Sequence, residues 1–384
     1  MKYSADRILT THTGSLPRPA SVTEMVFAKE RGEPFDEDAF ATTIASAVEE
    51  TVRRQVATGI DVVSDGEMSK ISYATYIKER ISGFEGDSPR RPPADLEDFP
   101  TLMEKLARAG GTPEYKRPCC RGAVRTENLQ PLRTDLANFR AAVDWASPVD
   151  AFMNAASPGV IALFQPNEYY ASHDEYLEAL AEAMRPEYEG IVEAGFSVQL
   201  DSPDLGLGRH MMFKDRPEQE YRSVAARHVE VLNHALRNIP KEKVRMHICW
   251  GNYEGPHTHD APMSTVLPIA LEARIGALVF ESANPRHAHE WQTFRDAALP
   301  DDLILVPGVI DSTTNFVEHP ELVAERICRF ADIVGRERVI AGSDCGFATF
   351  AGFGAVDGEV AYAKLAAMVE GARLATSRLW AGAA

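Results

Sequence analysis

Short apolar runs alternate along the chain with segments in which apolar residues recur every three or four positions. The clearest segment of the second kind runs from Phe40 to Val56, with an apolar residue at every fourth position, which is the spacing of one helix face. The short runs have the length of buried β-strands, and we place eight of them near residues 8, 61, 160, 197, 244, 277, 303 and 338. Eight successive strand–helix units predict an α/β fold of the (β/α)8 type, a closed TIM barrel, rather than an open doubly wound sheet.

The alternation breaks down between about residues 83 and 158. Proline, arginine and acidic residues dominate Asp87 to Pro100, and Cys119 to Val124 has the pattern of an inserted strand. We interpret this region as an excursion from the barrel after its second βα unit, within a single domain that spans residues 1–384. Long irregular segments of compact proteins often serve a function, so a lid or a subunit contact is one interpretation. A surface insertion without such a role is the other.

The composition excludes some classes of partner. The net charge of −17 opposes attraction to nucleic acid and to anionic membranes, so we expect neither as a partner. The N-terminus lacks the apolar core of a signal peptide, and no apolar run of the sequence approaches the length that spans a bilayer, so we expect a cytoplasmic protein. Five cysteines in 384 residues do not form a disulfide framework, and thiols in a reducing compartment are better suited to bind a metal.

Four side chains that can bind a metal lie at or beyond the ends of predicted strands in the second half of the chain. The run Val244 to Ile248 contains His247, and Cys249 follows two positions later, so both side chains project from the same face of an extended chain. Two further strands are followed by Glu281 and Cys345. Barrels build their sites at the carboxyl ends of strands, and thiolate, imidazole and carboxylate are ligands of zinc. We therefore predict Zn²⁺ bound by His247, Cys249, Glu281 and Cys345.

Seven motifs in order along the chain carry a family resemblance. They are Thr11–Pro17 (THTGSLP), Val63–Glu67 (VSDGE), Val198–Asp201 (VQLD), His247–Cys249 (HIC), Phe280–Ser282 (FES), Pro307–Asp311 (PGVID) and Ser343–Gly346 (SDCG). Together they span nearly the whole chain. In type and order they resemble the catalytic domain of cobalamin-independent methionine synthase and its relatives, which include epoxyalkane:coenzyme M transferase.

The resemblance implies a reaction. In that family zinc activates a thiol, which attacks an electrophilic carbon, so we expect a zinc-dependent enzyme that transfers a methyl or other alkyl group to a small-molecule thiol, as in methionine biosynthesis. A carboxylate is a weaker ligand than a thiolate. We therefore expect Glu281 to yield its place when the thiol arrives, and we count Glu281 and Asp311 as catalytic residues. We expect Asp344 to orient His247 or another ligand.

The resemblance also indicates which residues hold the thiol substrate. In the methionine synthase family, the positions that match Ser15, Glu67 and Asp201 bind the amino acid part of the thiol, and the carboxylates pair with its ammonium group. Two acidic groups at a barrel mouth favour a cationic or zwitterionic ligand over a bare sulfonate. We expect Asp311, Asn252 and Tyr253 to line the same pocket.

Two departures from the methionine synthase pattern concern the alkyl donor. Thr313 stands where that enzyme has a histidine thought to protonate the leaving pterin, and threonine is no substitute as a proton donor. The segment Ala162–Tyr170 lacks the Trp-Ser pair associated with folate stacking. Both departures argue against methyltetrahydrofolate. A corrinoid protein is another candidate methyl donor, and a homo-oligomer is compatible with the sequence.

Three alternative functions remain open, one of which is a non-catalytic zinc protein or a partner of a corrinoid protein. One alternative on the same fold is the opening of an epoxide by a thiol, as in epoxyalkane:coenzyme M transferase. That reaction predicts cationic side chains for the sulfonate of coenzyme M, and Arg18, Lys70 and Arg209 are candidates near strand ends. From another class, a lyase of the uroporphyrinogen decarboxylase type on a related barrel would need no metal.

Overall fold

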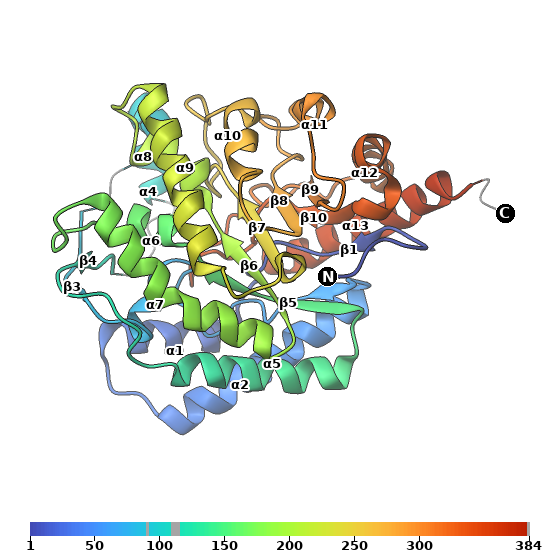
Figure 1. Ribbon diagram of the computed structural model, residues 1–384. Helices are drawn as coiled ribbons and strands as arrows, with labels where there is room; N and C mark the ends of the chain where they lie inside the picture. The colour runs from blue at the N-terminus through green and yellow to red at the C-terminus, as the bar shows by residue number, and fades with distance from the viewer. Residues whose placement is uncertain (90–91, 109–115, 382–384) are drawn as a thin grey trace.

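The computed structural model describes residues 1–89, 92–108 and 116–381, and its strands form a parallel eight-stranded sheet rolled into a nearly closed barrel (Figure 1). From one edge to the other the order is β1-β10-β9-β8-β7-β6-β5-β2. These strands are β1 (Leu9–Thr10), β2 (Val62–Val63), β5 (Asp150–Ala156), β6 (Ser197–Asp201), β7 (Val244–Ile248), β8 (Ala277–Phe280), β9 (Ile304–Ile310) and β10 (Ile340–Ser343). The predicted (β/α)8 fold is confirmed.

The two edge strands, β1 and β2, meet at a seam. The Asp61 amide donates to the Thr10 carbonyl (3.1 Å), and Thr11 Oγ1 donates to the Val62 carbonyl (2.9 Å). The carboxylate of Asp61 also accepts a hydrogen bond from the Thr10 amide (2.9 Å) and pairs with Arg7 (2.7 Å). A backbone hydrogen bond and these side-chain contacts therefore close the barrel where the strand ladder ends.

Helices pack around the barrel (Figure 1). They are α1 (Ala20–Arg31), α2 (Glu37–Thr58), α5 (Gln130–Ala146), α6 (Pro158–Phe164), α7 (His173–Glu193), α8 (Gly208–Met211), α9 (Glu218–Ala235), α10 (Met263–Ala270), α11 (Trp291–Asp296), α12 (Pro320–Val334) and α13 (Gly358–Leu379). Within the described residues, no helix combines the length and apolarity needed to cross a membrane.

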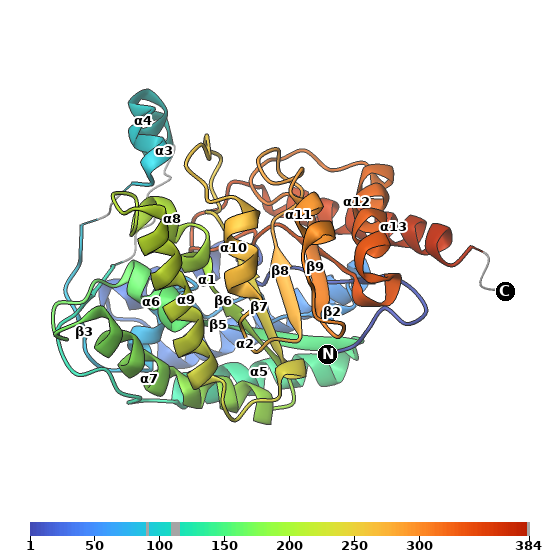
Figure 2. The ribbon, with the colours of Figure 1, turned by 45° about the horizontal axis from the view of Figure 1, so that its top comes forward.

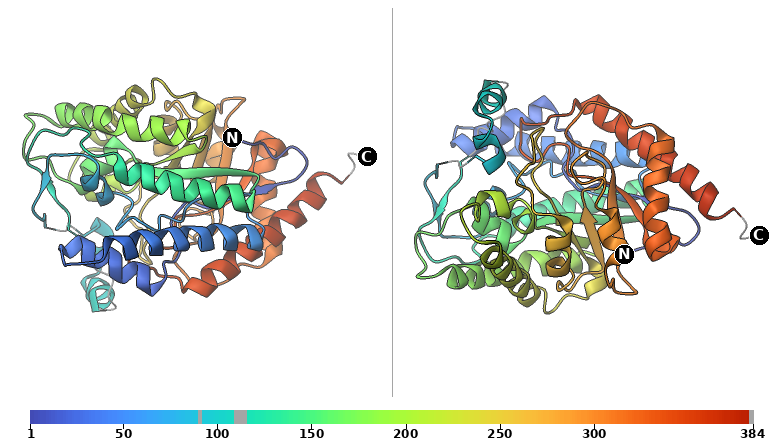
Figure 3. Two further views of the ribbon diagram at one scale, coloured as in Figure 1. Left: turned by 90° about the horizontal axis from the view of Figure 1, so that it is seen from below. Right: turned by 90° about the horizontal axis from the view of Figure 1, so that it is seen from above.

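Local side-chain chemistry explains where the longer helices begin and end. The carboxylate of Asp36 accepts a hydrogen bond from the Ala39 amide at the start of α2, and Gly59 ends that helix at a φ of 97°, a backbone conformation that favours glycine. Ser172 caps α7 by accepting a hydrogen bond from the Glu175 amide (3.1 Å), as the capping-box pattern predicts. Figure 3 shows α2 and α5 lying side by side when the molecule is seen from below.

One predicted strand, Val160 to Phe164, is wrong. These residues belong to α6, which starts with Pro158 and is capped by Ser157, whose Oγ accepts a hydrogen bond from the Val160 amide (3.1 Å). Every residue of α6 is buried, so its apolar run has no polar face, and a run of this kind has the same pattern as a buried strand. The third barrel strand is instead β5, which pairs with β2 and β6.

The excursion is therefore shorter than the predicted range of 83–158. Helix α5 packs against α2, and β5 follows it in the barrel sheet. The inserted elements are the antiparallel pair β3 (Phe84–Glu85) and β4 (Cys119–Cys120), with α3 (Ala94–Glu97) and α4 (Pro100–Arg108) between them. Residues 90–91 and 109–115 of the predicted excursion lie outside the described residues. Figure 2 shows α3 and α4 standing clear of the helices around the barrel.

Candidate metal centre and substrate pocket

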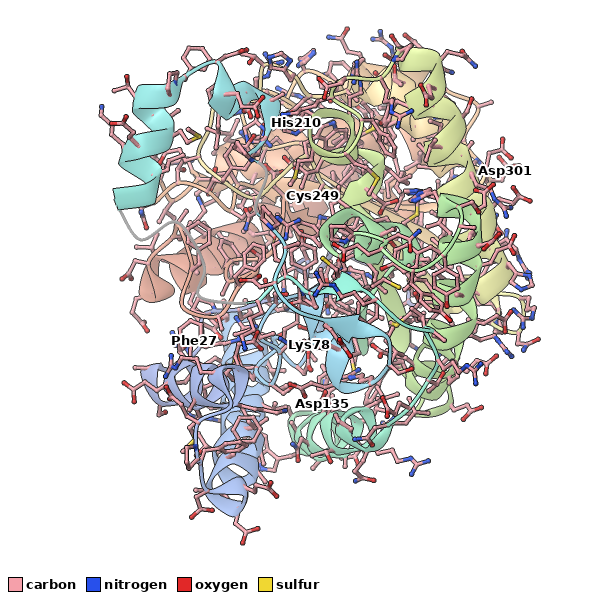
Figure 4. All side chains as sticks on the ribbon, turned by 90° about the vertical axis from the view of Figure 1, so that its left-hand side faces the viewer. Phe27, Lys78, Asp135, His210, Cys249 and Asp301 are labelled. Atoms are coloured by element: carbon pink, nitrogen blue, oxygen red, sulfur yellow. The ribbon has the colours of Figure 1, made fainter. Side chains whose placement is uncertain are left out.

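Three of the predicted metal ligands converge at the carboxyl ends of the strands. His247 lies near the end of β7, Cys249 follows that strand, and Cys345 follows β10. All three side chains are buried, and their metal-binding atoms lie within 4.8 Å of one another. The two Sγ atoms are 3.7 Å apart. Cys249, which is labelled near the centre of the view in Figure 4, is buried.

The surroundings of this cluster favour a bound cation. Nδ1 of His247 lies 3.1 Å from the carboxylate of Asp201, whereas its buried Nε2 has no hydrogen-bond partner among the described residues. A carboxylate on one ring nitrogen orients the other toward a metal. Although burial opposes ionisation, hydrogen bonding to Cys249 and the neighbouring His247 lower the pKa of Cys345 to about 6. The thiolate is the form of cysteine that binds a metal, so a lowered pKa favours this role.

Glu281 follows β8, but its carboxylate lies outside the group of three. One oxygen accepts a hydrogen bond from the Trp250 amide (2.8 Å), and the other accepts one from Asn284 Nδ2 (2.7 Å). Both oxygens thus have partners within the protein, and the role of Glu281 as a fourth ligand stays a prediction.

Asp344 orients the segment that follows Glu281. Its carboxylate accepts hydrogen bonds from the backbone amides of Ser282, Ala283 and Asn284, each at 2.8 Å. His247 is paired with Asp201 instead. Because Asp344 fixes the turn after Glu281, it acts on that predicted ligand and not on the imidazole.

A cavity of about 540 Å³ opens onto the three-residue cluster. Its lining includes all five predicted substrate residues and the three clustered ligands: Ser15, Glu67, Asp201, Asn252, Tyr253, His247, Cys249 and Cys345. Residues at the ends of the first, second and fourth barrel strands, and at the ends of later strands, therefore surround one cavity.

The polar floor of the cavity contains two buried carboxylates. Glu67 has a φ of 58°, an unusual conformation that often marks a functional position. Burial raises the pKa of Glu67 to about 8, and its Oε2 lacks a hydrogen-bond partner among the described residues. Asp201 accepts hydrogen bonds from Asn154 Nδ2 (3.1 and 3.3 Å). A buried, unpartnered carboxylate oxygen suits a ligand that brings hydrogen-bond donors.

Asn154 is a cavity residue that the sequence interpretation missed. It belongs to β5, in a stretch that we had assigned to the excursion. The available signal was a single amide side chain within the apolar run Ala151–Ala156.

Asp311 is absent from the described lining of the cavity. Its carboxylate accepts hydrogen bonds from the amides of Thr313 and Thr314, both at 2.8 Å. It also lies 3.4 Å from the buried Lys364 ammonium, which pairs with Glu318 at 2.9 Å. These contacts fix the loop after β9. They give Asp311 a structural role, and its catalytic role stays a prediction.

The three basic residues considered for a sulfonate bind main-chain carbonyls. Arg18 donates to Ala348 (2.7 Å), Lys70 to Asn154 (2.7 Å) and Arg209 to Phe213 (2.6 Å). None of the three belongs to the described lining of the cavity.

Beyond the polar floor, the cavity wall is apolar. It comprises Tyr73, Pro93, Leu96, Met103, Leu106, Phe164, Leu207, Met211, Phe350 and Phe353. Several of these residues belong to the inserted α3–α4 segment, which is anchored by Asp95. The carboxylate of Asp95 accepts hydrogen bonds from the Tyr253 hydroxyl (2.7 Å) and the His257 amide (2.8 Å), and it lies 3.7 Å from His210, which Figure 4 labels beside this segment.

Several known proteins are similar to this chain in sequence. A family model described as "Cobalamin-independent synthase, Catalytic domain" matches residues 158–374. A methionine synthase of Saccharolobus solfataricus is 27% identical over 375 residues, which cover 96% of this chain and 95% of that protein. A methionine synthase of Sulfurisphaera tokodaii is 25% identical over 371 residues, which cover 96% of this chain and 93% of the relative.

Solved structures share the fold. A B12-independent methionine synthase from a Shewanella species, in complex with selenomethionine, has a TM-score of 0.69 at 18% identity and covers 98% of this chain and 99% of its own. A putative vitamin-B12 independent methionine synthase from Listeria monocytogenes has a TM-score of 0.64 at 18% identity, with 96% and 98% covered. The family model spans more than half of the sequence. This chain therefore belongs to the family of the cobalamin-independent synthase catalytic domain.

Proposed function

We propose that this chain is a zinc-dependent enzyme that transfers a methyl group to the thiol of a small amino acid, for which homocysteine has the required groups. The observation that carries the proposal is that the His247–Cys249–Cys345 cluster lines the same cavity as Glu67, whose Oε2 lacks a hydrogen-bond partner among the described residues. The thiol of an amino-acid substrate would lie at the three metal-binding residues, and its ammonium group would lie at Glu67 and Asp201 in the polar floor of the cavity. The methionine synthases among the relatives support such a reaction.

The residues divide into two groups by chemistry. Two thiols and an imidazole nitrogen that has no hydrogen-bond partner among the described residues fit the preferences of zinc. When bound, zinc would lower the pKa of the acceptor thiol and hold it as a nucleophile. Asp201 supplies negative charge for the ammonium group of the acceptor, and binding of that group favours ionisation of Glu67. Asp201 also contacts His247, so a single carboxylate links the two halves of the site.

Epoxide opening by a sulfonate-bearing thiol is less well supported. Because Arg18, Lys70 and Arg209 donate to carbonyls, the described lining offers a sulfonate no lysine or arginine. A metal-free lyase of the uroporphyrinogen decarboxylase type would not require a cluster of two thiols and an imidazole.

Metal analysis and thioether formation test the proposal together. We expect about one zinc per purified chain, loss of that zinc in Cys345→Ser, and its retention in Cys328→Ser, which changes a cysteine of α12. Incubation with homocysteine and a methyl donor should give methionine only with the zinc-containing proteins. Full activity in a metal-free chain, or unchanged zinc content and activity in Cys345→Ser, would refute the proposal.

A further inference from the structure

The register of the barrel strands brings Asn154 next to Asp201, the carboxylate that links the two halves of the site. Asn154 on β5 lies opposite Gln199 on β6. Two positions further along β6, Asp201 lies opposite His247 on β7. Residues two positions apart in a strand share one face of a sheet with the residues opposite them on neighbouring strands. The sheet therefore presents Asn154, Asp201 and His247 to the same cavity, and all three belong to its lining.

The side-chain amide of Asn154 is held through its nitrogen. Nδ2 donates to the Thr13 carbonyl (3.0 Å) and lies 3.3 and 3.1 Å from the two carboxylate oxygens of Asp201. A carbonyl and a carboxylate only accept hydrogen bonds, so together they require that the nitrogen of the amide, and not its oxygen, faces Asp201. Oδ1 of Asn154 has no hydrogen-bond partner among the described residues. The nitrogen is therefore the atom through which Asn154 acts on its neighbours.

The loop after β1 confines this amide. A Cβ atom on Gly14 would overlap the amide atoms of Asn154, so the backbone of Gly14 packs directly against them. Gln199 is a more distant partner of Asp201, because its Nε2 donates to the Thr13 carbonyl and lies 3.5 Å from one oxygen of Asp201. Of these two amides, Asn154 is the one that contacts both oxygens of the carboxylate.

The direction of the Asp201 carboxylate matters for both halves of the site. One of its oxygens lies 3.1 Å from Nδ1 of His247. Burial raises the pKa of Glu67 to about 8, so Glu67 is mostly protonated at neutral pH before the acceptor binds. Asp201 is then the carboxylate that attracts the ammonium group of the acceptor. If this carboxylate turned, it would weaken one of its two contacts.

We propose that Asn154 is a positioning residue, which holds the carboxylate of Asp201 between His247 and the ammonium group of the acceptor. The inference rests on the proposed function. Without the amide, the carboxylate is free to rotate about its Cβ–Cγ bond. A fixed partner binds a ligand more tightly than a mobile one, because less conformational freedom is lost on binding.

Two thiols that differ only in the amino group test the inference. Homocysteine and 4-mercaptobutyrate share the thiol and the carboxylate, so the ratio of their dissociation constants isolates the contribution of the ammonium group. Isothermal titration calorimetry of the zinc-containing enzyme gives this ratio. For the wild type we expect homocysteine to bind about 10- to 100-fold more tightly.

Asn154→Leu removes the donor and keeps a side chain of similar size. The Thr13 carbonyl retains its hydrogen bond from Gln199, so the loop after β1 keeps a partner. We expect the preference for homocysteine to fall about tenfold, while the affinity for 4-mercaptobutyrate changes less than about twofold. Asn238→Leu is the matched control, since it removes an exposed amide that donates to the carboxylate of Glu189 (2.9 Å), and it should leave the preference unchanged.

A double substitution shows whether Asn154 acts through Asp201. In an Asp201→Asn background, Asn154→Leu should change the preference by less than about twofold, because residues that act through one contact are not additive. Asn154→Asp is a second variant of the same shape. At low pH its carboxyl group keeps a proton that it can donate to Asp201, whereas at higher pH the two carboxylates repel each other. Relative to the wild type at the same pH, its preference should fall between about pH 5 and about pH 9.

The outcomes separate this inference from the proposed function. An undiminished preference in Asn154→Leu, in an enzyme that forms methionine, would overturn the positioning role alone. Equal reductions by Asn154→Leu in the wild-type and Asp201→Asn backgrounds would do the same, since Asn154 would then act independently of Asp201. A wild-type enzyme that binds homocysteine no better than 4-mercaptobutyrate and forms no methionine would refute the proposed function and this inference together.

Discussion

The buried carboxyl group of Glu67 makes the stability of the protein depend on pH in a direction that can be tested. Burial raises its pKa from the usual 4.5 to about 8, so the folded state holds a proton that the unfolded state has already released. Stability from this group is complete below pH 4.5 and is lost as the pH rises to 8. The variant Glu67→Gln keeps the shape of the side chain and has no proton to lose.

The size of this effect on stability follows from the difference between the two pKa values of Glu67. At about 1.36 kcal/mol per pH unit, the difference between 4.5 and 8 corresponds to an upper limit of roughly 5 kcal/mol. We therefore expect Glu67→Gln and the wild type to have similar free energies of unfolding near pH 5. Toward pH 8 the variant should become progressively more stable than the wild type.

Urea denaturation at a series of pH values measures this difference directly. Glu254→Gln, which changes an exposed residue at the same cavity, serves as the control and should show no such trend. Homocysteine at pH 8 should stabilise the wild type more than Glu67→Gln, because its ammonium group pairs with the ionised carboxylate. A stability difference that stays constant between pH 5 and 8 would show that Glu67 is not protonated in the folded state.

Two further substitutions test other parts of the site. Asp201→Asn weakens the hydrogen bond to His247 and should lower zinc affinity about 10- to 100-fold, measured by competition with a chromophoric chelator; unchanged affinity would mean that the imidazole needs no such partner. Lys364→Met leaves the carboxylates of Asp311 and Glu318 without the buried cation that they contact and should reduce the free energy of unfolding by about 3–5 kcal/mol, measured by urea denaturation. The exposed Arg373→Ala is its control and should change stability by less than about 0.5 kcal/mol, so equal effects would contradict the reasoning.

The sequence pattern was sufficient for the barrel but not for every strand. Strands such as β8 and β9 are short apolar runs between turns and helical repeats, so length and spacing identify them. The run Val160–Phe164 has the same appearance because α6 is buried on all sides. The strand β5 precedes it, and its place in the sheet depends on pairing with β2 and β6, which are distant in sequence.

The candidate site was likewise only partly predictable from the sequence. Residues at strand ends converge because the barrel brings all such ends together, which is why His247, Cys249 and Cys345 could be grouped from the sequence. The direction of a carboxylate side chain depends on hydrogen bonds within its loop. The spacing of residues in the sequence does not reveal these hydrogen bonds. Asp311 was therefore expected in the cavity, whereas its own loop and Lys364 hold it.

Asp95, which anchors the α3–α4 segment, can affect the rate of turnover. Its carboxylate ties the α3–α4 segment to Tyr253 and His257, and this segment contributes part of the cavity wall. Any widening of the entrance on that side has to break hydrogen bonds to a buried anion. Release of the spent donor is then a step that can limit turnover, and residues far from the transferred carbon can set its rate.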